Sequence, residues 1–208
     1  MLFLTRCDFA PNTPLTPISD KTNAELIQLL DTFRYDNDEV SEYDFYIIVE
    51  ELEKRGASAS EAAPILAEMI AFNGSTSVMA SHPLVAMGPS AQSAIPYLLK
   101  NLESDREDVR RYSIFVLGTI EEPARCAVPF IAPYLWDPDP FVRSASAGAL
   151  TEITQIMLVE DDLYRLDPRS PGSVAADGDD ASISRIAREW WMETGRNLNW
   201  LEENCTHP

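Results

Sequence analysis

The stretch between residues 94 and 153 contains one sequence pattern twice, and this repeat constrains the fold more than any other feature. A period in this range is typical of α-solenoids, whose units are helical hairpins that cannot bury their apolar surface alone. The repeat therefore predicts helical pairs that stack on one another. The positions that recur 33 residues later are Pro96 as Pro129, Val109 as Val142, and Leu117 as Leu150.

Apolar residues in both halves of each unit recur at the spacing of a helix. In the first half they fall at i, i+3, i+4 and i+7, which places them on one face of a 3.6-residue helix. The second half continues in the same way after Val109 and Val142. We expect a chain of helices without strands, whose core between the third and fourth repeats includes Leu98, Val116, Leu117, Leu135 and Leu150.

Both copies resemble HEAT-like repeats, of the variety named after phycobilisome lyases. The resemblance rests on Ala94-Ile95-Pro96-Tyr97-Leu98, Ala127-Val128-Pro129-Phe130-Ile131, an acidic turn, and then Val109-Arg110 or Val142-Arg143. It implies a right-handed α-solenoid with the second helices on its concave side, and a proline well inside each first helix. It also implies that each arginine pairs with a turn aspartate: Arg110 with Asp105 or Asp108, and Arg143 with Asp137 or Asp139.

The repeat divides the chain, which we expect to form one domain of 208 residues. Terminal repeats of a solenoid are commonly atypical, because one of their faces meets water. We also expect His82-Pro83 to interrupt the second helix of the second repeat. The predicted segments are an extended arm at 1–19, a degenerate repeat at 20–56, repeats at 57–88, 89–121 and 122–156, an acidic loop at 157–181, and a tryptophan-containing C-terminal cap at 182–208.

The chain is strongly acidic, with 34 Asp and Glu against 16 Lys and Arg, a formal net charge of −18. This balance argues against nucleic acid and anionic membrane as partners, because phosphate binding depends on neutralisation by Lys and Arg. No apolar run is long enough to cross a bilayer. We expect another protein as the partner, with a basic face as one option. The alternative is that the acidity only keeps the solenoid soluble.

The cysteines and histidines give no sign of catalysis or metal binding. Cys7, Cys126 and Cys205 show no disulfide framework, which favours a reducing compartment and a cytoplasmic protein with Cys126 as a packing residue. The tryptophan-containing C-terminal end resembles that of bacterial HEAT-repeat proteins. The two histidines, one of them His82, lie outside any ligand spacing. The acidic run at 177–180 lacks the ligand pattern of a calcium loop. We predict no catalytic residue, cofactor or metal.

The best candidate site is a groove along the second helices, centred on Phe115. Residues here fall off the core stripe of their helix, and an exposed apolar patch of this kind marks a binding site. The groove would carry large side chains at one end and small ones at the other. The alternative is that the arm, the acidic loop or the tryptophan helix covers it. The predicted lining is Arg111, Ile114 and Phe115, with Ser144 and Ala147 one repeat on and Leu84 and Val85 one repeat back.

Three functions are compatible with this sequence. The first and favoured one is a non-enzymatic scaffold or adaptor that binds a protein on the concave surface. The second is an immunity or inhibitor protein that captures a basic toxin. The third is an enzyme of the bilin lyase or HEAT-like DNA glycosylase type. The lyase alternative rests on the repeat alone, and the glycosylase alternative requires a basic groove. The sequence makes no prediction of the oligomeric state.

Overall fold

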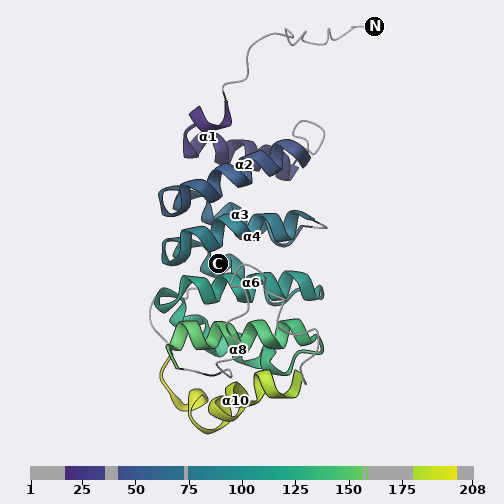
Figure 1. The fold of residues 1–208 in the computed structure, drawn as a ribbon, viewed down its shortest axis with the longest axis vertical. Coiled ribbons are helices and arrows are strands. Elements are labelled where there is room, and N and C mark those ends of the chain that lie inside the picture. The colour runs from purple at the N-terminus through teal and green to yellow at the C-terminus, as the bar shows by residue number, and fades with distance from the viewer. Residues whose placement is uncertain (1–16, 36–41, 73–74, 157, 159–179, 201–208) are drawn as a thin grey trace, which may run out of the picture.

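A computed structural model shows an all-α solenoid (Figure 1). It describes residues 17–35, 42–72, 75–156, 158 and 180–200, and this part of the chain contains no strand. The fold class predicted from the repeat is therefore confirmed. Most of the arm at 1–19, almost all of the acidic loop at 157–181 and the end of the cap at 201–208 lie outside the described residues.

Four helical hairpins follow one another and a final helix closes the stack (Figure 1). The second helices lie side by side and form what we call the second-helix face: α2, α4, α6 and α8. The hairpins are α1 (Asn23–Tyr35) with α2 (Glu42–Arg55), α3 (Ala63–Met69) with α4 (Ser75–Met87), α5 (Ile95–Asn101) with α6 (Glu107–Ile120), and α7 (Val128–Ile131) with α8 (Pro140–Thr154), and the final helix is α10 (Asp180–Glu193).

Each first helix from the second hairpin on begins as a 3₁₀ segment: η2 (Gly56–Ala62), η3 (Gly88–Ala94) and η4 (Glu122–Ala127). Pro64, Pro96 and Pro129 lie in the first α turn that follows, where no backbone donor is needed. Because each first helix begins with its 3₁₀ segment, the proline lies inside that helix, at the change from 3₁₀ to α, as the resemblance implied. Pro133 begins a further 3₁₀ segment, η5 (Ala132–Trp136). Pro83, expected to interrupt its helix, lies within a continuous α4.

A residue of positive φ terminates every second helix. Gly56 (φ 51°), Gly88 (φ 53°), Glu121 (φ 59°) and Gln155 (φ 58°) hold this position in the four hairpins. A left-handed residue just past a helix end redirects the chain and lets its N–H bond to a terminal carbonyl. Glu121 N–H donates to Gly118 O at 3.0 Å and Gln155 N–H to Thr151 O at 2.9 Å.

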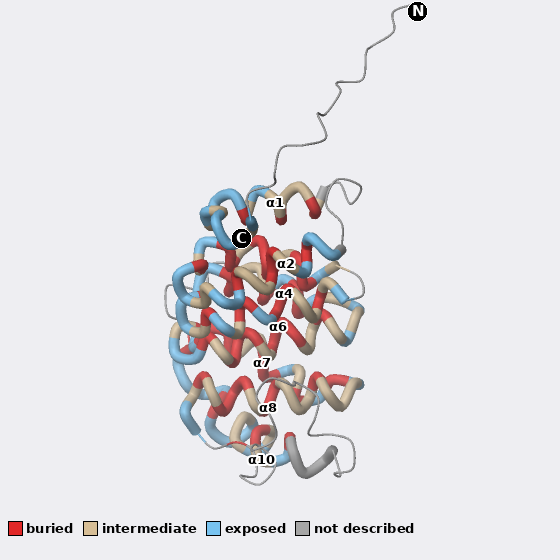
Figure 2. The backbone as a smooth tube through the Cα atoms, turned by 45° about the horizontal axis from the view of Figure 1, so that its top comes forward, coloured by how far each residue is buried: buried red, intermediate tan, exposed pale blue. Residues whose placement is uncertain are grey.

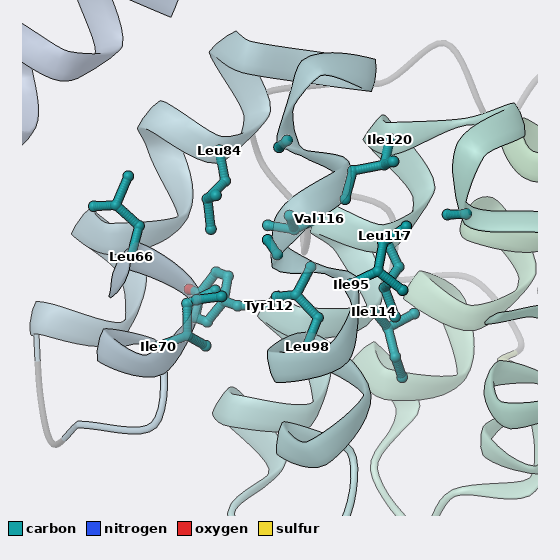
Figure 3. Packing of buried hydrophobic residues seen from close by; sticks show 14 of the residues in the cluster. Leu66, Ile70, Leu84, Ile95, Leu98, Tyr112, Ile114, Val116, Leu117 and Ile120 are labelled. Atoms are coloured by element: carbon teal, nitrogen blue, oxygen red, sulfur yellow. The ribbon is translucent and has the colours of Figure 1, made fainter. Parts of the chain in front are cut away.

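The buried hydrophobic residues form one core cluster, and residues coloured as buried run along the whole stack (red in Figure 2). Close packing of α6 and α8 depends on Gly118, because an added Cβ would lie 2.9 Å from Ala149 Cα. Figure 3 shows Leu98, Val116 and Leu117 within the packed interior. All five core residues predicted from the repeat are buried: Leu98, Val116, Leu117, Leu135 and Leu150.

Polar side chains join successive hairpins by bonding to carbonyls at the ends of the first helices. The last carbonyls of a helix accept no hydrogen bond within that helix, so a donor from the next hairpin can bond to them. The last donor comes from α10, which thus bonds to the fourth hairpin as a further first helix would. The bonds are Asn101 Nδ2 to Ala67 O (2.8 Å), Tyr134 Oη to Leu102 O (2.5 Å) and Arg188 Nε to Leu135 O (2.7 Å).

Tryptophans close the C-terminal end. Trp190 and Trp191 of α10 lie against Gly195, where a Cβ would approach both rings to 2.8 Å. Trp200 is buried, packs edge-on to Trp190, and its indole N–H donates to Gly195 O at 2.7 Å. Arg125 of η4 lies over the Trp200 ring. The aromatic cluster therefore fixes the chain after α10 against the fourth hairpin.

Candidate functional site

The four residues of positive φ that end the second helices show which positions of α2, α4, α6 and α8 are equivalent. Phe115 lies six residues before Glu121, His82 six before Gly88, and Glu50 six before Gly56. These three side chains are therefore equivalent, and all are partly or fully exposed. The equivalence we inferred from sequence, which placed Leu84 and Val85 beside Phe115, was displaced by two to three residues.

Three residues predicted to line the groove are core residues. Leu84, Ile114 and Ala147 are each 0% exposed. Leu84 occupies the place of Leu117 and Leu150, which face the interior of the stack. Ile114 points inward beside Leu98 and Leu117 (Figure 3). The cause is the width of the buried stripe, because a second helix contacts its hairpin partner and both neighbouring second helices.

The other four predicted groove residues, Val85, Arg111, Phe115 and Ser144, are half-buried and remain candidates. Arg111 is held by aromatic rings: its Nη2 donates to Tyr112 Oη at 2.9 Å, and its Cζ lies 4.6 Å from the Tyr112 ring centroid. It also lies 5.6 Å from the centroid of Phe141 on α8. The chain's own side chains therefore cover the junction of α6 and α8.

Helix α4 is unusual in a chain this acidic. Its sequence, Ser75–Met87, contains no Asp, Glu, Lys or Arg. Surface helices ordinarily present charged residues opposite their buried stripe. Here the side chains with solvent exposure are apolar or neutral, and they include Val78, Met79, His82, Val85 and Ala86. The middle of the second-helix face is thus an uncharged strip.

Helix α2 borders this strip with aromatic and acidic residues. Tyr43 is 70% and Tyr46 50% exposed. A shallow depression of about 400 Å³ lies where α2 meets α4, lined by Glu50, Glu53, Lys54 and Ala86. Lys54 Nζ lies 3.1 Å from Glu50 Oε1, and this hydrogen bond raises the pKa of the ammonium.

The turn aspartates make different pairs from those the resemblance implied. Arg110 forms a two-pronged ion pair with Asp137 of the next hairpin, at 2.9 and 3.0 Å. This hydrogen bond raises the pKa of Arg110. Asp105, the expected partner, is exposed, and Asp108 pairs with Arg106 instead. The acceptor for Arg110 thus belongs to the neighbouring repeat, where hairpin stacking places it.

Arg143 binds the turn of its own hairpin through backbone carbonyls. Its Nη1 donates to Asp137 O at 2.6 Å and to Pro138 O at 2.9 Å. Asp139 serves as the N-cap of α8, since its Oδ1 accepts from Phe141 N–H and Val142 N–H. The Val-Arg arginines therefore fix the turns and the contact between repeats.

Two carboxylates lie close together where α6 and α8 end. The pKa of Glu152 is raised, chiefly by burial and then by the negative charge of Glu121. The negative charge of Glu121 therefore adds to the free-energy cost of ionising Glu152. Glu121 is also the residue of positive φ that ends α6.

Cys126 is buried, as expected of a packing residue, but it is disulfide-bonded, so the expectation of no disulfide was wrong. The other two cysteines of the chain, Cys7 and Cys205, lie outside the described residues. Disulfides persist in oxidising compartments and are rare in the cytosol. The cysteines thus no longer support a cytoplasmic location, which stays a prediction.

Within the described residues, no group of three or more His, Cys, Asp or Glu side chains could hold a metal ion. The acidic run at 177–180 falls almost wholly outside that part of the chain. Among the helices that the structure describes, none is long and apolar enough to cross a membrane.

The stacked hairpins define an α-solenoid protein, a class that presents an extended helical face rather than an enclosed pocket. Residues 95–168 match the family model of HEAT repeats, which covers the third and fourth hairpins. These two hairpins are therefore HEAT-like repeats, as the sequence pattern predicted. No curated protein and no solved structure matches it significantly.

Proposed function

We propose that this protein is a non-enzymatic scaffold that binds another protein on its second-helix face. The observation that carries the proposal is the uncharged outer strip of α4, in a chain with a net charge of −18. Water-facing apolar surface is costly unless a partner covers it, so such patches mark interaction sites. HEAT repeats are commonly protein-interaction scaffolds, which agrees with this assignment.

Phe115 and His82 are the best positions at which to test for contact with a partner. They are equivalent positions on neighbouring hairpins and lie on either side of the boundary between α4 and α6. Phe115 is half-buried and His82 exposed. Aromatic residues dominate the binding energy of many interfaces, so Phe115→Ala should lower capture of the partner at least about tenfold. The midpoint of thermal unfolding should remain close to that of the wild type.

Site-specific photo-crosslinking in the organism that encodes the chain tests the proposal. A photoreactive amino acid replaces His82 or Phe115, and Lys100, which is exposed on the first helix α5, serves as the control. Both second-helix positions should yield the same crosslinked protein, and position 100 should not. Equal crosslinking at position 100, or none at positions 82 and 115, would show that this face is not the binding surface.

A further inference from the structure

The junction of α2 and α4 has a depression near the C-terminal end of α2, whereas Arg111 covers the junction of α6 and α8 near the N-terminal ends of those helices. At the covered junction Arg111 spans from α6 to the Phe141 ring of α8. At the open junction there is a depression of about 400 Å³, to which α4 contributes Ala86. The two helices pack directly against each other below it. An incoming chain therefore has room at this end of the second-helix face.

The two sides of this depression differ in chemistry. The α4 side is uncharged and contributes the exposed Ala86. The α2 side contributes Glu50, Glu53 and Lys54, and Lys54 is paired with Glu50. Glu53 is exposed and forms no ion pair with any other residue that the structure describes. An apolar side and an acidic side thus lie next to each other.

Tyr43 and Tyr46 extend the acidic side along one edge of α2. They are separated by three positions, which places them on the same face of the helix. Both are at least half exposed, so their ring faces are accessible. An aromatic face attracts Lys and Arg, and the attraction adds to that of neighbouring carboxylates. The combination favours a cationic side chain over a neutral or anionic one.

We propose that the junction of α2 and α4 binds a basic amphipathic segment of the partner protein. Its apolar residues would cover Ala86 and the uncharged outer surface of α4. Its Lys or Arg side chains would contact Glu53 and stack on Tyr46. The net charge of −18 complements such a segment and attracts it over a longer range. This inference rests on the proposed scaffold function and names the chemistry of its partner.

Two synthetic peptides of equal length probe the site without knowledge of the natural partner. Both place the same leucines on one face of a helix, while the other face carries Lys and Arg in one peptide and Glu in the second. Binding to the full chain is measured by isothermal titration calorimetry, and the contact surface is mapped from backbone NMR shifts. The basic peptide should bind and shift residues of α2 and α4. The acidic peptide should not bind.

Charge reversal at two exposed glutamates separates a specific site from general attraction. Glu53→Lys and Glu61→Lys both change the net charge from −18 to −16. Glu61 is exposed on η2, which belongs to a first helix. Glu53→Lys should weaken binding of the basic peptide at least about fivefold, and Tyr46→Ala about tenfold. Glu61→Lys should change the affinity less than about twofold, since it lies away from the contact.

Equal weakening by both lysine variants would overturn the inference, because attraction would then be non-specific. Shifts centred on α6 and α8, or equal binding of the acidic peptide, would overturn it too. Circular dichroism confirms that each variant is folded before titration. The outcomes stay separable from those of the scaffold proposal. Crosslinking at positions 82 and 115 without peptide binding would reject only the basic segment, whereas crosslinking at position 100 would reject the scaffold surface itself.

Discussion

Replacing Glu121 with glycine should stabilise the protein. Glu121 has φ 59° and ψ −133°, in a region of backbone space that only glycine adopts without strain. Gly56 and Gly88 occupy the equivalent position of the two preceding hairpins. The chain thus uses glycine at the end of the second helix in the first two hairpins, and Glu121 and Gln155 in the last two.

The expected gain follows from two opposing effects. A side-chain-bearing residue in such a conformation costs about 1–3 kcal/mol, which Glu121→Gly removes. Glycine also increases the freedom of the unfolded chain, which costs about 0.5–1 kcal/mol. The free energy of unfolding should therefore rise by about 0.5–2 kcal/mol. For a chain of this length that corresponds to an increase in Tm of about 1–8 °C.

Far-UV circular dichroism during thermal and urea unfolding measures this change, because the signal reports on all helices. Glu121→Ala is the matched control, since alanine removes the carboxylate but keeps the Cβ that causes the strain. It should change the stability by less than about 0.5 kcal/mol. Gln155→Gly should give a smaller gain than Glu121→Gly, because Gln155 (φ 58°, ψ 24°) lies in the ordinary left-handed region.

Two results would refute the reasoning. A loss of stability in Glu121→Gly would mean that the glutamate side chain makes contacts worth more than the backbone strain. An equal gain in Glu121→Ala would mean that the relevant effect is the repulsion between the carboxylates of Glu121 and Glu152, not the conformation of the backbone.

Four further substitutions test the packing and the charge of Glu152. Asp137→Ala should cost about 2–4 kcal/mol in urea unfolding, because it leaves the charge of Arg110 unpaired at 13% side-chain exposure; a loss below about 1 kcal/mol would contradict this. Ser113→Ala should stabilise the protein by about 1 kcal/mol, because the buried Ser113 hydroxyl has no hydrogen-bond partner. Ser146→Ala, at the equivalent position 33 residues later, should destabilise it, because the Ser146 hydroxyl donates to a carbonyl; the opposite order of stabilities would contradict this reasoning. Glu152→Gln should stabilise the folded protein at neutral pH, because the raised pKa of Glu152 means that the folded state disfavours the ionised carboxylate. The gain in stability should disappear as the pH falls below the ordinary pKa of 4.5, and a gain that does not depend on pH would contradict this explanation.

The period and the apolar spacing predicted the helical hairpins and their core. Leu117 and Leu150 recur 33 residues apart because each repeat buries the same stripe. The register of the second repeat was harder to predict, because Glu121 stands where the earlier hairpins have glycine. Aligning Gly56 and Gly88 with Glu121 would have placed His82 beside Phe115.

Contacts between repeats could not be read from the repeat pattern. The resemblance implied Asp105 or Asp108 for Arg110, whereas the observed acceptor, Asp137, is 27 residues away in sequence. Which turn lies next to which helix depends on how far successive hairpins rotate, and no single residue encodes that angle. The open junction at α2 and α4 was missed for a related reason, because α2 lacks the Val-Arg signature of the later second helices.

The position of the tryptophans decides what a fluorescence experiment on this protein can report. All four lie between positions 136 and 200, in η5, in α10 and around Gly195. Solenoids are held mainly by contacts between neighbouring units, so their ends can unfold at different denaturant concentrations. Tryptophan fluorescence would follow only the C-terminal end, and the first three hairpins would melt without a tryptophan signal. A tryptophan at Tyr97 of α5 would supply an emission probe for the middle of the stack.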